Sequence, residues 1–241
     1  MTLGVTLSGS AAAGGRALFG PLVFSVHSEE WTCLLGTSGA GKTTMLRLIA
    51  GLETGVAFEG TIAADDGISL KGRIALMAQT DLLLPWLDVV DNVLMGHRLR
   101  GEVTPEARLR AQDLIARVGL KEHSAKRPSA LSGGMRQRAA LARTLMEDRP
   151  LVLLDEPFSA LDARTRAEMQ ELAFELLQGR TVLLVTHDPA EAARLGHRIQ
   201  ILDHGSLKEV EPPSSAAIRA YDDPEVFECQ TAMMTRMRKA A

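Results

Sequence analysis

The sequence contains few aromatic residues, few cysteines and no long apolar run. Aromatic side chains make up 4% of its 241 residues. The two cysteines, Cys33 and Cys229, cannot build a disulfide framework and do not stand at metal-ligand spacing, which indicates a reducing compartment. No apolar run approaches the roughly 18 residues that span a bilayer, and the first residues lack the basic start of a secretion signal. We therefore expect an intracellular chain that does not cross a membrane by itself.

An excess of basic residues is also absent. The chain has 27 Lys and Arg against 30 Asp and Glu, and its formal net charge is -3. Binding to nucleic-acid phosphates depends on basic excess, so we expect no nucleic-acid partner. Hydrophobic residues at 46% and charged residues at 24% are typical of a soluble globular protein whose length allows one large domain.

The apolar pattern after the first thirty residues predicts strands that alternate with helices. Short apolar runs typical of buried strands are found at 31–35, 73–77, 151–154, 181–186 and 198–202. The stretch 88–146 has the pattern of consecutive helices, one of them starting at Thr104 and Pro105 and ending at Gly119. This order predicts an α/β core with a helical insertion.

The two ends of the chain have patterns of their own. Residues 2–7 and 22–26 alternate apolar and polar side chains, as half-buried antiparallel strands do. The small residues 8–15 between them predict a flexible loop. Residues 224–239 predict a final helix, to which we assign no chemistry.

A glycine-rich segment, Gly36–Thr43, matches the pattern G-x-x-x-x-G-K-[ST] between a predicted strand and a predicted helix. Its glycines let successive N–H groups curl around phosphate oxygens, and the helix adds its positive end. Lys42 is suited to reach the β- and γ-phosphates, and the Thr43 hydroxyl to ligate Mg²⁺. The predicted nucleotide-binding residues here are Gly36, Thr37, Ser38, Gly39, Ala40, Gly41, Lys42, Thr43 and Thr44.

Two acidic residues follow the apolar run 151–154. Their position predicts the carboxyl end of a sheet strand, where open α/β sheets bind ligands. Asp155 is suited to hold Mg²⁺, and Glu156 to act as general base on the attacking water. The alternative is a strand that simply stops at polar residues, but the phosphate-binding motif in the same chain favours the functional interpretation.

The segment 131–138 opens a long helix that we expect to run through Met146. Ser132 is a good N-cap, and Gly133 and Gly134 expose backbone N–H groups at the positive helix end. This segment resembles the signature sequence of ATP-binding cassette (ABC) ATPases. Three further sites match that family in order, namely its Q-loop glutamine, its D-loop aspartate and its switch histidine: Gln79, Asp162 and His187.

The resemblance implies an α/β fold, that of a P-loop NTPase of the ABC type. It has a RecA-like core, an N-terminal antiparallel β subdomain and an inserted α-helical subdomain. The expected single domain spans 1–241, with the core and β subdomain in 1–78 and 150–212, the helical subdomain and signature helix in 79–149, and a tail in 213–241.

The resemblance also implies ATP and Mg²⁺ as cofactors and a homodimer as the working state. In this family each ATP lies between the phosphate loop of one subunit and the signature helix of the other. Ser132, Gly133 and Gly134 would therefore serve the opposite subunit's nucleotide. The implied catalytic residues are Glu156, His187, Gln79 and Lys42, the implied metal ligands are Thr43, Gln79 and Asp155, and Asp162 joins the nucleotide-binding set.

The sequence departs from the family pattern at two positions. Met135 follows the double glycine where the family often has glutamine, and we interpret it as a marker of one importer branch. Ala13 stands where the family usually has an aromatic residue that stacks on adenine. Losing that stack would cost roughly 1 kcal/mol of nucleotide affinity, so we expect weaker adenine discrimination.

The segment 82–87, Leu-Leu-Leu-Pro-Trp-Leu, resembles importer ATPases for nitrate, sulfonates, taurine and thiamine-precursor pyrimidines. Segments 16–22, 31–36 and 195–198 are most similar to the hydroxymethylpyrimidine importers of that branch. The implied function is an ATPase on the cytoplasmic face of the inner membrane, bound to integral permease subunits and served indirectly by a periplasmic or extracellular substrate-binding protein. An apolar groove suits a permease helix, but ordinary packing explains residues 82–87 equally well.

Two other functions compete with transport. A soluble ABC ATPase in DNA repair or translation would need heptad insertions, a second cassette or a basic surface, none of which is visible. A regulatory cassette that binds ATP without turnover commonly loses its general base and switch histidine, whereas Glu156 and His187 are present.

Overall fold

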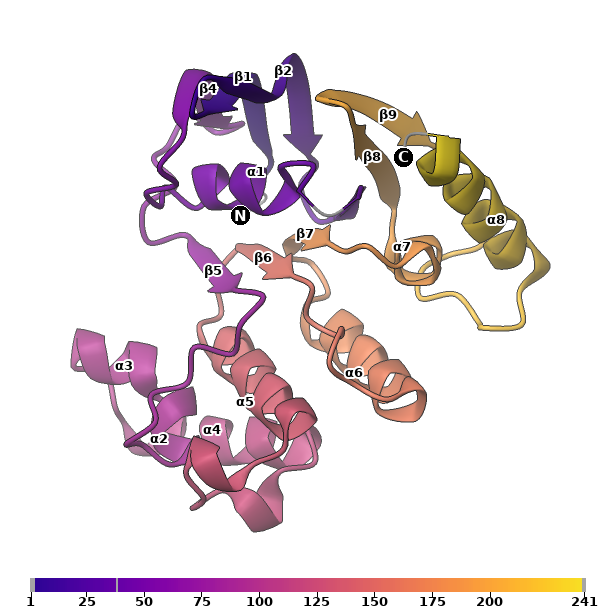
Figure 1. Cartoon of the computed structure of the whole chain (residues 1–241). Helices are drawn as coiled ribbons and strands as arrows, with labels where there is room; N and C mark the ends of the chain where they lie inside the picture. Colours follow the sequence, from indigo (N-terminus) through magenta and orange to yellow (C-terminus); the bar gives the residue numbers. More distant parts are fainter. Residues whose placement is uncertain (1–2, 38, 240–241) are drawn as a thin grey trace. The chain divides into compact units, whose positions relative to one another are not determined.

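The computed structural model describes residues 3–37 and 39–239, which form two compact units (Figure 1). The first unit comprises Met1–Ile74, Pro150–Asp155 and Gly179–Ala241 and contains both β-sheets. The second comprises Ala75–Arg149 and Glu156–Gln178 and is mainly helical. Strand β5, Ile74–Met77, carries the chain from the first unit into the second.

A mainly parallel sheet forms the core of the first unit. Its strands lie in the order β6-β7-β3-β8-β9, and only β9 runs antiparallel to its neighbour. Every residue of β3, β6 and β7 is buried, which explains their unbroken apolar runs. The strands are β3 (Trp31–Leu35), β6 (Leu151–Asp155), β7 (Thr181–Val185), β8 (Arg198–Asp203) and β9 (Ser206–Val210). The predicted strands of this sheet are confirmed.

A second, antiparallel sheet in the first unit corrects one prediction. Its strands are β1 (Val5–Ala13), β2 (Arg16–Val26) and β4 (Ala57–Ala64), with β1 in the middle. The small residues expected to form a loop at 8–15 therefore lie mostly within β1. They are small because backbones approach closely: a Cβ on Gly9 would lie 2.2 Å from the Glu59 carbonyl oxygen.

Two strands, β4 and β9, carried no clear apolar signal in the sequence. Most of their side chains are exposed or only partly buried, and the burial pattern of β9 leaves a single fully buried residue, Val210. Hydrogen bonding to β1 and β8 defines these strands, whereas their own side-chain patterns do not.

The helices of the first unit follow its strands. Helix α1 (Lys42–Ile49) follows the phosphate loop, and α7 (Pro189–Leu195) follows β7. Helix α8 (Pro224–Lys239), the predicted final helix, is confirmed and packs beside α7 (Figure 1). The buried Arg219 guanidinium holds the chain before α8 by donating hydrogen bonds to the carbonyls of Ala193, Gly196 and Pro213.

The second unit confirms the predicted helical region. Its elements are α2 (Val89–Val93), α3 (Met95–Arg100), α4 (Pro105–Arg117), η1 (Lys121–His123), η2 (Pro128–Ala130), α5 (Gly133–Met146) and α6 (Ala163–Leu176). The Thr104 side chain caps α4 by accepting from the Ala107 N–H, with Pro105 in the first turn, and the chain turns at Gly119 (φ +71°).

Helix α6 differs from the expected division of the chain, which placed 150–212 in the core. Residues Glu156–Gln178 pack with the helical unit instead. The buried Gln137 side chain of α5 explains this, because it donates to the Glu156 carbonyl (3.0 Å) and accepts from the Ala160 N–H (2.8 Å). Helices α5 and α6 then pack together.

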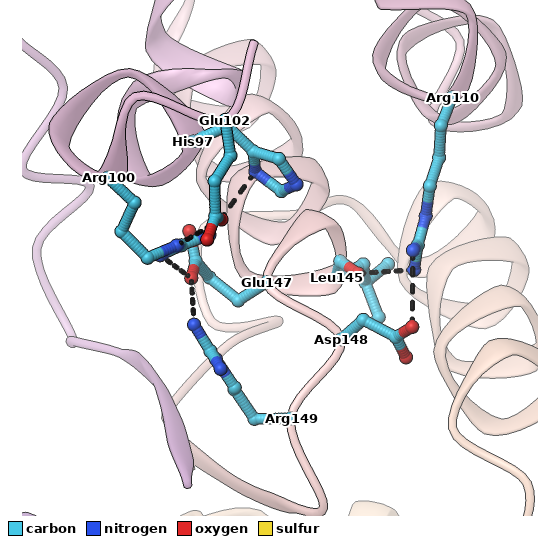
Figure 2. Close-up of polar contacts among 8 residues, drawn as sticks. All are labelled: His97, Arg100, Glu102, Arg110, Leu145, Glu147, Asp148 and Arg149. Carbon is cyan, nitrogen blue, oxygen red and sulfur yellow. Dashed lines mark hydrogen bonds and ion pairs between the residues drawn. The ribbon is translucent and has the colours of Figure 1, made fainter. Parts of the chain in front are cut away.

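An ion-pair network ties α3 to the carboxyl end of α5 (Figure 2). The Arg100 guanidinium lies between the carboxylates of Glu102 and Glu147, at 2.7 Å from each, and Arg149 reaches Glu147 at 3.8 Å. Glycine at position 96 leaves room for the Glu147 carboxylate, because a Cβ there would come within 1.6 Å of the Glu147 Oε1 atom. None of the helices within the described residues is long and apolar enough to cross a membrane.

Candidate nucleotide site

The phosphate loop follows β3 directly, in the first unit. Gly36 has φ +155°, and a Cβ there would lie 2.5 Å from the Leu202 carbonyl oxygen, so only glycine fits. Gly41 has φ +100° and precedes the first turn of α1. The predicted site residue Ser38 lies outside the described residues. The loop therefore has the tight turn and the helix start that the motif requires.

Lys42, in the first turn of α1, points back over the loop. Its side chain is 6% exposed, and its Nζ donates to the carbonyls of Gly36 (2.8 Å) and Thr37 (3.0 Å). Thr44 is half-buried in the same turn. The ammonium charge is thus held beside the backbone N–H groups that would surround a phosphate.

Thr43 and Asp155, separate in the sequence, meet at the end of β6. The Thr43 hydroxyl donates to the Asp155 carboxylate at 3.2 Å, and Asp155 is buried. A hydroxyl and a carboxylate are hard oxygen donors of the kind that Mg²⁺ prefers. Within the described residues no group of three or more His, Cys, Asp or Glu side chains is placed to hold a metal. These two oxygens fit a magnesium ion that also binds phosphate oxygens.

His187 belongs to the same edge of the sheet. It is exposed and follows β7, whereas its neighbour Thr186 is buried and donates to Glu191 at 2.7 Å. Asp188 caps α7 by accepting from the Ala190 N–H at 2.9 Å. Because β3, β6 and β7 are parallel neighbours, the phosphate loop, Asp155 and His187 all lie at their carboxyl ends.

Gln79 and Glu156, of the second unit, form a pair. The Gln79 Nε2 atom donates to the Glu156 carboxylate at 3.3 Å. Glu156 has φ +49°, a left-handed conformation that is uncommon for a residue with a side chain and that clusters at functional sites. The structure thus brings together the residues expected to orient water and to accept its proton.

The signature helix α5 begins as predicted, with Ser132 accepting from the Met135 N–H at 3.3 Å. A Cβ on Gly134 would lie 3.4 Å from the Ala160 carbonyl, whereas a Cβ on Gly133 would meet only the Arg136 side chain, at 3.9 Å. Nothing in the packing therefore requires Gly133 to be glycine. Its small size leaves the N–H groups of the helix start accessible.

Asp162 is the N-cap of α6, where its carboxylate accepts from the Thr165 N–H at 3.0 Å. Hydrogen bonds from the Thr165 backbone and side chain lower the pKa of Asp162. The predicted site residues therefore form two sets. One lies in the first unit around the phosphate loop, and the other lies in the second unit around Glu156 and the start of α5.

Comparison with known proteins decides the family. The family model described as ABC transporter matches residues 19–159. The chain belongs to the ABC transporter ATPases. It is 49% identical over 193 residues to an uncharacterized ABC transporter ATP-binding protein of Haemophilus influenzae, covering 80% of this chain and 79% of that one. It is 40% identical over 236 residues to the aliphatic sulfonates import ATP-binding protein SsuB of Cupriavidus necator, covering 94% and 75%.

A solved structure agrees with the fold of this ABC ATPase. The dimeric ATP-binding cassette MJ0796, in a post-hydrolysis state bound to ADP and Pi, superposes with a TM-score of 0.75. It shares 28% identity, and the match covers 90% of this chain and all of that one. The predicted fold class, a P-loop NTPase of the ABC type, is confirmed.

Sequence reasoning missed the residues of the ABC ATPase that hold the segment after Gln79. The Arg143 guanidinium of α5 donates to the carbonyls of Asp81 (2.6 Å) and Leu82 (2.8 Å), and Arg136 pairs with the Asp81 carboxylate at 3.0 Å. Burial lowers the pKa of Arg143. Arginines on a helix form no distinctive sequence pattern that would predict these contacts. Only the fold shows that the signature helix holds this segment through hydrogen bonds and an ion pair.

Asn92 shapes the rest of the same segment. Its fully buried amide accepts from the Leu84 N–H (2.7 Å) and donates to the carbonyls of Leu84, Leu87 and Asp88. The segment so held presents Leu82 and Trp86 to solvent, at 62% and 65% exposure. The apolar segment 82–87 is therefore partly exposed to solvent.

Proposed function

We propose that this chain is the ATP-hydrolysing subunit of an importer for a small solute, bound peripherally to the cytoplasmic face of the cell membrane. The observation that carries the proposal is the presence of two sets of residues in one chain: Lys42 with Thr43 and Asp155, and Gln79 with Glu156. The first set suits a magnesium nucleotide, and the second suits the water that attacks it. The importer role is supported by 40% identity to the sulfonate importer ATPase SsuB over 94% of the chain.

Hydrolysis needs a positioned water and a base. The water oxygen forms a bond to the γ-phosphorus, the bond from that phosphorus to the bridging oxygen of ADP breaks, and Glu156 accepts the water proton. The Gln79 amide, which donates to Glu156, orients the carboxylate toward that water. Lys42 neutralises charge on the phosphate oxygens, and His187 contacts the γ-phosphate. A magnesium ion held by Thr43 and Asp155 would supply further charge stabilisation.

A second copy of the chain would complete each site. The exposed start of α5, at Ser132, Gly133 and Gly134, offers N–H groups to the γ-phosphate held by the partner's loop. The related cassette MJ0796 is dimeric, which supports the same arrangement for this chain. ATP would then join two subunits and be hydrolysed between them.

The catalytic part of the proposal is tested by ATP turnover and by dimer formation in size-exclusion chromatography. Glu156→Gln removes the base but keeps the site's shape, so the variant should bind ATP, lose turnover and accumulate as an ATP-bound dimer. Lys42→Ala should lose nucleotide affinity and turnover together. Normal hydrolysis by Glu156→Gln would refute the mechanism, and stimulation by DNA or ribosomes would favour a soluble ABC ATPase instead.

The importer part is tested by co-purification with membrane permease subunits. Trp86, exposed beside the Q-loop segment, suits an apolar contact with a short permease helix. Trp86→Ala should weaken co-purification while leaving ATPase activity of the isolated subunit unchanged. Leu109→Ala is the matched control, because Leu109 is 67% exposed on α4, outside this segment. Equal effects of both substitutions would refute the docking surface.

The transported solute is a finer proposal. The SsuB relatives favour an aliphatic sulfonate, and the resemblance of segments 16–22, 31–36 and 195–198 favours a thiamine-precursor pyrimidine, with nitrate as a further member of the branch. Binding of taurine, an alkanesulfonate, nitrate and hydroxymethylpyrimidine to the cognate substrate-binding protein separates these possibilities. Uptake assays in cells that carry Glu156→Gln then test whether this subunit powers the transport.

A further inference from the structure

A cavity of about 550 Å³ opens beside the phosphate loop, within the first unit. It is lined by the start of β2 at 16–20, by Thr37, Gly39 and Ala40 of the loop, and by the β8–β9 turn at 203–205. Small-molecule sites measure roughly 300–1,000 Å³, and a phosphate group alone needs far less. The cavity therefore has room for the nucleoside that a bound triphosphate would carry.

The described lining of the cavity lacks an exposed phenyl, phenol or indole ring on which a base could stack. Phe19 is the one Phe, Tyr or Trp among the described residues that line it, and His204 of the β8–β9 turn adds an exposed imidazole, 3.7 Å from the Asp203 carboxylate. Phe19 is 1% exposed, and its Cδ1 atom lies 3.4 Å from the position of a Cβ on Gly41. The Phe19 ring therefore packs against the phosphate loop and exposes no ring face to a ligand.

Arg16, which lines the cavity, stands directly across the hairpin from Ala13. The two residues are register partners of β1 and β2, joined by Gly14 and Gly15 with φ of +55° and +79°. Opposite residues of an antiparallel pair project to the same face, with Cβ atoms about 4.5–5.5 Å apart. The small Ala13 methyl leaves room on that face. The long Arg16 side chain can therefore extend over the space that an aromatic side chain at position 13 would fill.

The Arg16 guanidinium is available for a ligand. It is exposed, and no residue that the structure describes forms a hydrogen bond or ion pair with it. The acid that lines the cavity, Asp203, is engaged by Lys208 at 2.5 Å and lies 3.7 Å from the His204 Nε2 atom. A guanidinium is planar and weakly hydrated, and it stacks on nucleobases in other proteins.

We infer that Arg16 stacks its guanidinium plane on the purine base of the bound nucleotide, in place of an aromatic side chain. This inference rests on the proposed function, because it needs a nucleotide in the phosphate loop. Stacking on a flat cation does not distinguish the hydrogen-bonding edges of adenine and guanine. Wild-type protein should therefore bind ATP and GTP with affinities within about threefold of each other.

Calorimetric titration with ATP, GTP and inorganic tripolyphosphate, all with Mg²⁺, tests the assignment. Arg16→Ala should weaken ATP and GTP binding by about tenfold, the loss of one stacked base, and leave tripolyphosphate binding unchanged. Arg47→Ala is the matched control, since it removes the same charge from an exposed position of α1 that does not line the cavity. The control should leave all three affinities unchanged.

Two further variants separate the possible outcomes. Arg16→Tyr should restore ATP affinity through its ring, which a purely ionic role of Arg16 would not allow. An equal loss of ATP and tripolyphosphate affinity in Arg16→Ala would overturn the stacking role in favour of a phosphate contact. Unchanged ATP affinity in that variant would also overturn it. The proposed function itself fails if the wild-type protein binds neither ATP nor tripolyphosphate. It also fails if Lys42→Ala binds both of them as tightly as wild type.

Discussion

Replacing Asn92 by alanine tests whether one buried amide shapes the segment after the Q-loop. The side chain makes four hydrogen bonds to residues 84–88. Two of its acceptors keep another donor, because the Leu84 carbonyl accepts from the Leu87 N–H and the Asp88 carbonyl from the Asn92 N–H. The Leu84 N–H and the Leu87 carbonyl have no other hydrogen bond to a described residue.

The expected cost follows from those two groups. A partly buried polar group left without its partner costs about 1–3 kcal/mol, so Asn92→Ala should lose roughly 2–3 kcal/mol of stability. For a chain of this size that corresponds to a fall of about 4–12 °C in Tm. Amide hydrogen exchange gives the local readout: the Leu84 amide should exchange at least about tenfold faster, because 1.4 kcal/mol is a factor of ten.

Asp91→Ala is the matched control on the same short helix. Asp91 forms a partly exposed ion pair with Arg98, and such pairs contribute about 0–1 kcal/mol. The control should leave exchange at Leu84 unchanged and shift Tm little. If Asn92→Ala leaves the exchange of residues 84–88 and the Tm as they are in wild type, the reasoning about this segment is wrong.

Three further predictions concern Gly36, Gly133 and the position expected to stack on the nucleotide base. Gly36→Ala should abolish ATP binding measured by calorimetry, because its Cβ would meet the Leu202 carbonyl at 2.5 Å in a strained conformation. Gly133→Ala should keep the wild-type Tm, since its Cβ meets only ordinary contacts, yet weaken the ATP-dependent dimer in size-exclusion chromatography; a full-strength dimer would argue against the shared site. On the Arg16→Ala background, Ala13→Tyr should tighten ATP binding by about fivefold, roughly 1 kcal/mol, and equal affinity with and without the tyrosine would count against an aromatic position there.

Local sequence was sufficient for much of this protein. Phosphate loops, helix caps and buried strands depend on neighbouring residues, so Gly36–Thr43, the cap at Ser132 and the acid at the end of β6 could be predicted in place. Their chemistry depends on residue type and short spacing, which a linear chain displays directly. The family resemblance then assigned Gln79 and His187 their expected roles.

Tertiary structure decided what depends on partners far apart in the chain. The small residues of β1 became a central strand only because β2 and β4 supply hydrogen bonds on both sides. Gln137 drew residues 156–178 toward the helical unit, and Arg143 and Asn92 turned an apolar run into a held, partly exposed segment. The register of β1 and β2 alone places Arg16 opposite Ala13, where the family usually has an aromatic residue. Such contacts arise from the folded geometry, because the pairing of distant polar atoms leaves no periodic pattern in the sequence.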